Sequence, residues 1–213
     1  MATQLIELFE DEKIKEKIQK RLPFLFHIAD IECTRGGRVG MEVGCVRERI
    51  LVALLIYKFG EHNVNVPSTI SPELDVRLFG EPISVKAAIM RSSRKLGAFK
   101  LKWTVNGIKA HEFANTYFPE CDLLMAQIRW NKRAGGLYYV PKEVQQRVFA
   151  EIGPDNYIKL PKPGTNPRGI EITSSALGKL VEDPLTKHLP MDWQISALGY
   201  SPYQRWLELW RQD

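Results

Sequence analysis

The fold of this chain is decided by residues 73–87, which read Glu73-Leu74-Asp75-Val76-Arg77-Leu78-Phe79-Gly80-Glu81-Pro82-Ile83-Ser84-Val85-Lys86-Ala87. Apolar and polar side chains alternate with period two on both sides of Gly80-Glu81, a pattern that predicts a β-hairpin. A loop of two or four residues makes the numbers of cross-strand partners sum to 161, so Asp75 lies opposite Lys86 and Arg77 opposite Ser84. One face is then apolar, and the other brings a carboxylate, a hydroxyl and an ammonium within about 5 Å of each other.

The polar face of this hairpin has two interpretations. An Asp–Lys pair on a solvated sheet face is common and needs no chemistry. The same pair beside a phosphate group would supply a metal ligand and a cation, the two kinds of group that phosphodiester hydrolysis requires. The spacing of the residues leaves both interpretations open.

The positive charge of the chain is concentrated beside the second strand of the hairpin. The 213 residues include 30 Lys+Arg and 25 Asp+Glu, for a formal net charge of +5. Residues 82–111 contain seven of the basic residues and no acidic one, so the remaining 23 basic and 25 acidic residues give −2. Apolar and aromatic side chains are interleaved there, which indicates a folded surface suited to phosphate contacts and favours nucleic-acid binding. The seven are Lys86, Arg91, Arg94, Lys95, Lys100, Lys102 and Lys109.

Outward from the hairpin, periodicity and turn signals predict a single mixed α/β domain in which helices flank a mixed sheet. Residues 1–60 form a helical N-terminal part, 70–160 the sheet core, and 161–213 a helical C-terminal part. The helix over residues 40–59 is apolar on every side across 50–56, which predicts that it is buried. Other helices are expected at 4–20, 109–118, 141–152, 174–182 and 202–211, other strands at 99–104, 123–130, 136–140 and 157–160, and connecting chain at 63–70.

The sequence also excludes several classes of protein. No apolar run reaches the ~18 residues of a membrane span, and the N-terminus does not resemble a secretory signal. Cys33, Cys45 and Cys121 are odd in number and widely spaced, which excludes a disulfide framework or a zinc motif and favours a reducing, cytoplasmic location. The Gly-rich segments lack the G-K-[ST] ending of a phosphate loop, so no nucleotide cofactor is expected.

The hairpin resembles the signature of the PD-(D/E)xK nucleases, in which an Asp on one strand is followed about ten residues later by acid-x-Lys. Asp75 with Ser84-Val85-Lys86 fits this pattern, with Ser84 in place of the acid. A few restriction endonucleases carry Ser-x-Lys here and take a Glu from elsewhere. The chain departs from the pattern in one more respect, because Pro72 precedes Asp75 by three residues rather than directly.

A longer part of the chain, about residues 38–146, resembles the ThaI-type subgroup of type II restriction endonucleases. This resemblance implies a restriction-endonuclease-like core, dependence on Mg²⁺, and cleavage of double-stranded DNA at a short palindrome by a homodimer. The alternatives are another nuclease of the superfamily, such as a repair enzyme or junction resolvase, and a non-catalytic DNA- or RNA-binding module. The resembling segments are residues 39–44, 47–48, 53–60, 83–86, 101–105 and 135–141.

The roles implied for the hairpin residues follow the needs of phosphodiester hydrolysis. Asp75 would be the principal Mg²⁺ ligand, and the Val85 carbonyl would be a backbone ligand by the family resemblance. Ser84 could hold a metal-bound water but supplies no charge. Lys86 would orient or help to deprotonate the attacking water and stabilise the developing negative charge.

A further carboxylate is needed, and Glu48 is the preferred candidate. Its neighbours at helical spacing are apolar, so it points toward the apolar side of a helix, where a carboxylate needs a cation, a metal or hydrogen bonds. An internal salt bridge to Arg47 or Arg49 is the alternative. Glu73 shares the strand face of Asp75 and is the runner-up, ahead of Glu42 and Glu112.

Basic residues after the motif are expected to hold the DNA backbone: Arg91, Arg94, Lys95, Lys100 and Lys102. Base readout is assigned to two loops, one with Arg35 and Arg38 and the other with Asn166 and Arg168. In the last expected helix, Trp206 and Trp210 lie four residues apart on one face, which is typical of a core or dimer contact rather than of base stacking.

Overall fold

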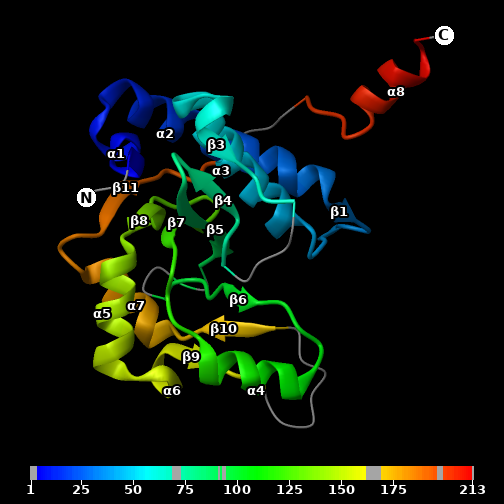
Figure 1. Ribbon diagram of the computed structural model, residues 1–213. Helices are drawn as coiled ribbons and strands as arrows, with labels where there is room; N and C mark the ends of the chain where they lie inside the picture. The colour runs from blue at the N-terminus through cyan, green and yellow to red at the C-terminus, as the bar shows by residue number, and fades with distance from the viewer. Residues whose placement is uncertain are drawn as a thin grey trace.

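The strand that carries Lys86, β5 (Glu81–Ile89), pairs in parallel with β7 (Asp122–Ile128) at the centre of a six-stranded sheet (Figure 1). The computed structural model describes residues 4–68, 73–90, 92, 95–161, 169–195 and 199–212. Strands follow the order β11-β8-β7-β5-β4-β3, and all the other neighbouring pairs are antiparallel. The remaining strands are β3 (Val64–Asn65), β4 (Val76–Leu78), β8 (Gly136–Val140) and β11 (Lys187–Pro190). This is the mixed sheet flanked by helices that the sequence predicts.

Both faces of the central sheet are covered by apolar cores. Successive side chains of a strand point to opposite sides, so one strand contributes to both cores. In β7, Leu124 and Ala126 belong to one apolar core, whereas Leu123 and Met125 belong to a second core on the other face. The interpretation of the hairpin's polar face as a solvated surface is therefore wrong. Ser84 and Lys86 are only 5% and 8% exposed.

The first core is closed by the N-terminal helices η1 (Gln4–Ile6), α1 (Glu7–Glu10), α2 (Glu12–Glu32) and α3 (Val43–Phe59). The helix α2 continues beyond the predicted end at residue 20, because apolar residues at Leu22, Phe26 and Ala29 extend its buried stripe. Gly60, with φ of 86°, ends α3 as predicted. The short helix η2 (Glu61–Asn63) then leads into β3, which lies where connecting chain was expected.

The prediction that α3 is buried on every side is wrong. Leu51 and Leu55 are fully buried, but Ala53 and Tyr57 are exposed. A helix at the outside of a two-layer arrangement buries only the stripe that faces the sheet and its neighbouring helix. The apolar residues on the remaining side of α3 line an open groove with α2.

The second core lies on the opposite face of the sheet, under a smaller sheet and four helices. The small sheet has the order β6-β10-β9, with β6 (Lys100–Lys102), β9 (Ile158–Lys159) and β10 (Ile170–Ile172). The strands β10 and β11 lie in the part that was predicted to be helical. The helices of this half are α4 (Gly107–Thr116), α5 (Lys142–Ile152), α6 (Pro154–Tyr157) and α7 (Ser174–Glu182).

Two elements lie at the margin of the structure. A short hairpin, β1 (Thr34–Arg35) with β2 (Arg38–Val39), joins α2 to α3. The last helix, α8 (Gln204–Trp210), stands away from the rest of the molecule (Figure 1). Within the described ranges, no helix combines the length and apolar character needed to cross a membrane.

The β4–β5 hairpin forms at the predicted place, but each residue of β4 pairs with a residue of β5 two positions earlier than predicted. Leu78 pairs with Glu81 and Arg77 with Pro82, so the partner numbers sum to 159. The two-residue turn is Phe79-Gly80, both with positive φ (50° and 89°), as a type I′ turn requires. Continuing this register places Asp75 opposite Ser84, and the Asp75 N–H donates to the Ile83 carbonyl at 3.1 Å. Because the shift is by two, every side chain keeps its predicted face.

Candidate active site

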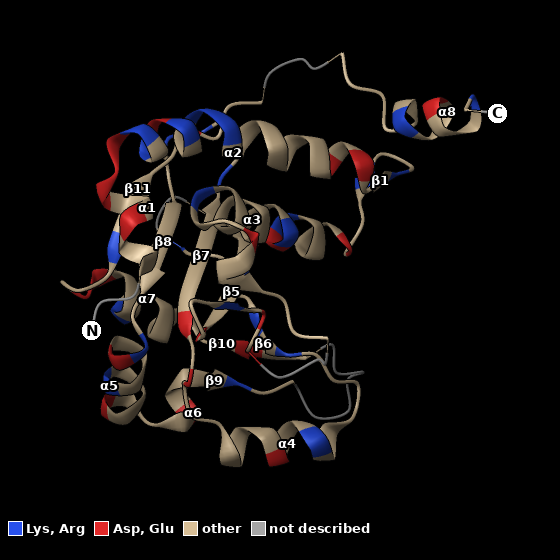
Figure 2. Ribbon diagram, turned by 45° about the horizontal axis from the view of Figure 1, so that its top comes forward, with Lys and Arg blue, Asp and Glu red and all other residues tan. Residues whose placement is uncertain are grey.

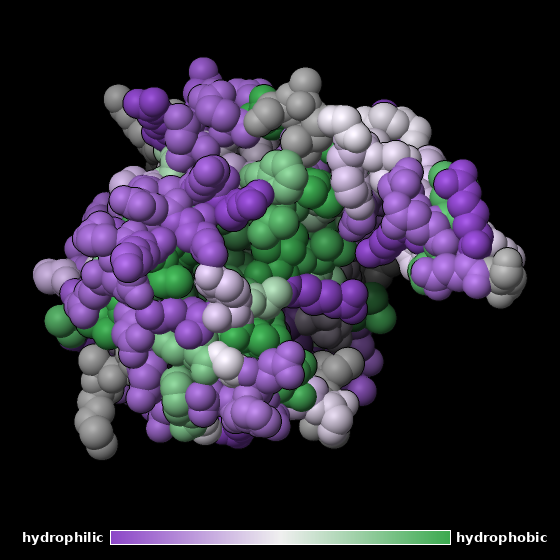
Figure 3. All heavy atoms as spheres, turned by 90° about the horizontal axis from the view of Figure 1, so that it is seen from above, coloured by the Kyte–Doolittle hydropathy of each residue, from purple (hydrophilic) through white to green (hydrophobic). Residues whose placement is uncertain are grey.

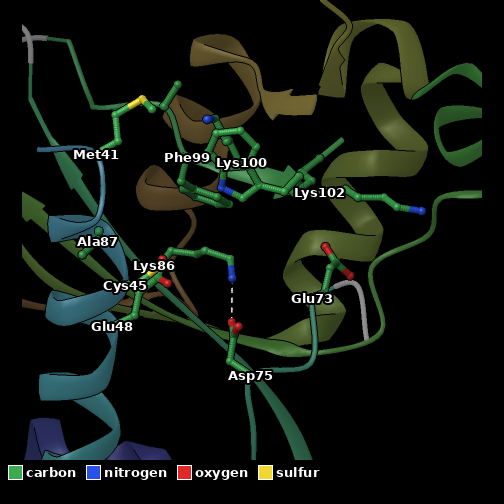
Figure 4. A pocket seen from close by; sticks show the side chains of 14 residues that line it. Met41, Cys45, Glu48, Glu73, Asp75, Lys86, Ala87, Phe99, Lys100 and Lys102 are labelled. Atoms are coloured by element: carbon green, nitrogen blue, oxygen red, sulfur yellow. Dashed lines mark hydrogen bonds and ion pairs between the residues drawn. The ribbon is translucent and has the colours of Figure 1, made fainter. Parts of the chain in front are cut away.

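A cleft of about 610 Å³ opens between the hairpin, the N-terminal half of α3 and β6 (Figure 4). Its polar lining comes from three directions: Asp75 and Lys86 from the hairpin, Glu48 from α3, and Glu73 from the chain that precedes β4. The cleft therefore collects all three carboxylates and the lysine that the sequence nominates. The rest of the lining is Met41, Gly44, Cys45, Ala87, Ala98, Phe99, Lys100, Leu101, Lys102 and Trp103.

Asp75 is held by three donors that all reach the same carboxylate oxygen. Its Oδ2 accepts from the Lys86 Nζ at 2.6 Å, from the Val85 N–H at 2.7 Å and from the Ser84 hydroxyl at 3.3 Å. These three residues are consecutive on β5, which is fixed on both sides by β4 and β7. No described residue donates to Oδ1, so this second oxygen can accept another ligand.

The Asp75–Lys86 pair joins a nearly buried ammonium group to a half-buried carboxylate across the hairpin. The Lys86 side chain is 11% exposed and that of Asp75 is 33% exposed. Because the true register places Lys86 two residues past the position opposite Asp75, its long side chain reaches back diagonally to the carboxylate. Dissolved salt screens the charges of a partly buried pair less than those of a pair on the surface, so this pair acts more strongly on nearby groups.

Glu48 projects from α3 toward this pair but has no partner of its own. Burial raises the pKa of Glu48 to about 7, an effect that the Lys86 charge opposes and the Asp75 charge reinforces. The alternative of a salt bridge to a neighbouring arginine is wrong for Arg47, which is buried and pairs with Asp30 of α2. Within the described residues, Glu48 forms no hydrogen bond or ion pair, so its carboxylate is available to a cation.

Glu73 lies on the other side of the Asp75–Lys86 pair, as Figure 4 shows. Its backbone has a φ of 66°, and burial raises its pKa to about 7. The Tyr117 hydroxyl donates to Glu73 Oε1, and the Glu120 N–H also donates to this carboxyl group. Burial raises the pKa of Tyr117 well above its ordinary value, so the phenol keeps the proton that it donates.

The donor set of the cleft fits a hard cation that keeps part of its water shell. No group of three or more His, Cys, Asp or Glu side chains among the described residues is assembled into a ready-made metal cage. Mg²⁺ in nucleases and related enzymes needs only one or two carboxylates, with waters and substrate phosphate completing the octahedron. The free Oδ1 of Asp75 and the unpartnered Glu48 carboxylate provide that number.

Two of the predicted DNA-backbone residues, Lys100 and Lys102, line the cleft. The Lys100 Nζ lies 3.3 Å from the centre of the Trp103 ring, and the Lys102 Nζ lies 4.9 Å from that of Phe113. Lys95 is exposed but is not part of the cleft lining. Arg91, Arg94, Asn166 and Arg168 lie outside the described residues.

Arg35 and Arg38 are both exposed and pair with each other across the β1–β2 hairpin. The Arg35 Nε lies 3.9 Å from Glu42 Oε1. In Figure 2 this hairpin and β6 lie on the same side of the molecule as the N-terminal end of α3, where the cleft opens. The two arginines thus lie outside the cleft lining, on the side of the molecule where the cleft opens.

Sequence reasoning missed two apolar side chains of the cleft, Met41 and Trp103. They are 69% and 57% exposed, and both line the cleft. Trp103 could have been nominated, because it follows Lys100 and Lys102 in the basic stretch and aromatic side chains stack on bases. Met41 gives no signal, since only the tertiary fold brings the start of α3 over the cleft.

A mixed sheet with helices on both faces, carrying Asp75 and Ser84-x-Lys86 on adjacent strands over a cleft, defines a restriction-endonuclease-like nuclease. The family model described as "Restriction endonuclease ThaI" matches residues 8–212. The chain belongs to the ThaI restriction endonuclease family and is accordingly a hydrolase of DNA phosphodiester bonds. This membership confirms the predicted family and enzyme class and decides against a repair enzyme, a junction resolvase or a non-catalytic module.

A solved structure supports the same assignment. The chain is similar to a protein described as "Restriction endonuclease in complex with substrate DNA", with 46% sequence identity and a TM-score of 0.89. The alignment covers 99% of this chain and 100% of the other. The predicted restriction-endonuclease-like core is therefore confirmed. No curated protein matches the chain.

Proposed function

We propose that this protein is a type II restriction endonuclease that requires Mg²⁺ and cuts both strands of double-stranded DNA at a short palindrome as a homodimer. One observation carries the proposal. The Asp75–Lys86 pair, joined at 2.6 Å, lies in a cleft beside a carboxylate, Glu48, that has no partner among the described residues. We also propose that the protein is cytoplasmic, because its three cysteines are free and two of them are buried.

Asp75 and Glu48 would hold the cation, Asp75 through Oδ1 and Glu48 through its unpaired carboxylate. The Val85 carbonyl is a further ligand implied by the family resemblance, while the Val85 N–H fixes Asp75 in place. A Mg²⁺ ion held by these residues would supply polarisation of the scissile phosphate and compensation of the negative charge that develops on it. Serine at position 84 supplies no charge, which is why a carboxylate from α3 is needed.

Lys86 serves the water that attacks the phosphorus atom. The ammonium group is held by Asp75 at a fixed point of the cleft, so it can orient the water, assist the loss of its proton and stabilise the charged transition state. The Ser84 hydroxyl, 3.3 Å from Asp75 Oδ2, can hold a second water in the same place. These roles require no movement of the sheet, because all three residues are anchored on the hairpin.

Glu73 is the second candidate for the metal-binding carboxylate. Its carboxyl group lines the same cleft but is already engaged by the Tyr117 hydroxyl and the Glu120 N–H. A carboxylate with two donors is stabilised without a metal, so Glu48 is preferred. Glu73 is better suited to fixing the chain where it enters β4.

The DNA backbone would lie along the basic wall of the cleft. Lys100 and Lys102 on β6 would contact phosphates, together with Arg91, Arg94 and Lys95 from the preceding stretch. Arg35 and Arg38, on the exposed hairpin beside the opening, would read base edges, as would Asn166 and Arg168. A two-fold symmetric pair of such clefts suits a palindromic site, since each copy would then cut one strand.

Incubation of supercoiled plasmid with the protein, with and without Mg²⁺ and then with excess EDTA, tests this proposal. Discrete limit fragments that require the metal are the expected result, and Asp75→Ala and Lys86→Ala should each lower the cleavage rate by at least ~10³-fold. Lys132→Ala, which removes an exposed lysine outside the cleft, is the matched control. Full cleavage in EDTA, or by the Asp75→Ala protein, would overturn the assignment of the site.

A further inference from the structure

The last described segment, residues 199–212, exposes an apolar surface that no other described residue covers. No residue of α8 is buried. Seven residues are too few for a helix to be stable in water without packing against something. The exposed side chains are Tyr203 (70%), Trp206 (50%), Leu207 (45%), Leu209 (54%) and Trp210 (85%).

The base of this segment is fixed, so that α8 points away from the body of the molecule (Figure 1). The Tyr200 hydroxyl donates to Glu32 Oε1, at the C-terminal end of α2. The Arg205 Nη1 lies 3.9 Å from the same Glu32 oxygen. The arm (residues 199–212) is therefore held in an outward direction by contacts with α2 rather than by packing of its own apolar residues.

The same chain carries an uncovered apolar groove between α2 and α3. Its volume is about 430 Å³, and its walls are mainly aliphatic. Figure 3, seen from above, shows a green apolar area in the middle of this face of the molecule with hydrophilic side chains around it. The lining residues are Lys17, Ile18, Arg21, Leu22, Leu25, Ile50, Ala53, Leu54 and Tyr57.

The arm and the groove are both apolar, and neither is covered by the described residues. Trp206 and Trp210 lie four residues apart on one side of α8, the spacing with which an amphipathic helix lays its anchors into a hydrophobic groove. Aromatic anchors in a desolvated groove are the residues that dominate interface energies.

We propose that α8 of one copy docks in the α2–α3 groove of a second copy, and that the second copy returns the contact. This inference rests on the homodimer proposed above and names the surfaces that hold it together. A reciprocal exchange fills both grooves and closes the assembly at two copies. The five apolar side chains, counted on both arms, would bury on the order of 1,000 Å² on the arm side alone, which is enough for a stable interface.

The exchange of helices would also set the distance between the two active sites. The helix α3 lines the groove with its C-terminal half (Ile50, Leu54 and Tyr57) and the cleft with its N-terminal half (Cys45 and Glu48). A partner seated on one half of this rigid helix is therefore held at a fixed distance from the other half. The dimer contact and the spacing of the two cuts would be set by the same element.

Sedimentation equilibrium of three variants tests the proposal. The wild type should be a dimer, and Trp206→Ala/Trp210→Ala should raise the dimer dissociation constant by at least ~100-fold. Ala53→Glu places a charge on the exposed floor of the groove, where docking of the apolar arm would have to desolvate it, and should also raise the constant. Val105→Ala/Ile108→Ala, which removes two equally exposed apolar side chains far from the arm, is the matched control and should leave it unchanged. All the substituted side chains are largely exposed, and circular dichroism checks that each variant is folded.

Mixing the two impaired proteins separates exchange between copies from folding of the arm onto its own groove. A mixed dimer of the Trp206→Ala/Trp210→Ala chain and the Ala53→Glu chain restores one intact arm–groove contact, so the mixture should associate more tightly than either variant alone. A mixture that associates no better than its components overturns the exchange. A dimer that persists in the arm variant overturns the docking site but leaves the proposed homodimer standing, whereas a monomeric wild type overturns both. Metal-dependent cleavage by the Asp75–Lys86 site is measured separately and is not affected by either result.

Discussion

Glu48 and Glu73 lie on two sides of one cleft, and burial raises the pKa of both to about 7, yet their surroundings differ. The Tyr117 hydroxyl and the Glu120 N–H donate to Glu73, whereas Glu48 has no partner among the described residues. A buried carboxylate that lacks donors must take up a proton or a cation. The two carboxyl groups therefore differ in what they can bind, although burial raises the pKa of both to about 7. Glu48, which lacks a partner, is suited to a metal ion.

The largest expected effect separates the two carboxylates by activity. Glu48→Gln should lower the rate of plasmid cleavage at saturating Mg²⁺ by about 10³-fold, because it removes a charged metal ligand from the cleft. Glu73→Gln should lower it by less than about tenfold, since the amide can still accept from Tyr117. Glu143→Gln, on the exposed side of α5, is the control for loss of a carboxylate. Equal losses in the two cleft variants, or the reverse order, would end the distinction.

The next effect is the pH dependence of metal binding. Because the pKa of Glu48 is raised to about 7, its proton must leave before a cation can bind. Calorimetric Mg²⁺ or Mn²⁺ affinity should therefore fall by up to about tenfold per pH unit as the pH is lowered below 7. This dependence of metal affinity on pH should vanish in the Glu48→Gln protein and persist in the Glu73→Gln protein. A slope that follows Glu73 instead would transfer the metal site to the other side of the cleft.

A smaller effect concerns the stability of the metal-free protein. The pKa of Glu48 is higher in the folded chain, about 7, than its ordinary value of 4.5. The unfolded chain therefore releases this proton first as the pH rises, and stability falls between about pH 4.5 and 7. In EDTA at pH 8, Glu48→Gln should raise the Tm by about 4–8 °C, and at pH 4 the two proteins should unfold together. A variant that is less stable at pH 8 would mean that Glu48 has a partner.

The smallest effect tests the role assigned to Glu73. Tyr117→Phe removes the hydroxyl that donates to Glu73 while keeping the ring in its aromatic cluster with Phe113, Phe149 and Tyr157. The loss should cost about 1 kcal/mol and lower the Tm by about 2–4 °C, with little change in cleavage. A large loss of cleavage with normal stability would show that Tyr117 and Glu73 act in the reaction.

The sequence predicts the hairpin and its polar face well, because period-two alternation is a local property of residues 73–87. It misplaces the turn, since Phe79 adopts a positive φ that is rare for an aromatic residue. The pairing of Asp75 with Lys86 survives this error only because a lysine side chain is long enough to reach the carboxylate diagonally.

What the sequence could not predict depends on contacts between distant residues. The hydroxyl that engages Glu73 belongs to Tyr117, 44 positions away along the chain. The strands β10 and β11 are three and four residues long, too short for their periodicity to stand out from neighbouring helices. The apolar stretch of α3 predicts burial on every side. The open groove depends on how α2 packs beside α3, which the sequence pattern does not show.

The wall of the cleft that carries Lys100 and Lys102 is held by a strand from late in the chain. The strand β6 pairs with β10, whose partner positions lie about seventy residues further on. A nascent chain that has already formed the Asp75–Lys86 hairpin therefore still lacks the support for its basic wall. In the order of synthesis, the residues that would cut DNA therefore precede the strand that supports the surface that would hold DNA, and this surface is completed only after β10 has been made.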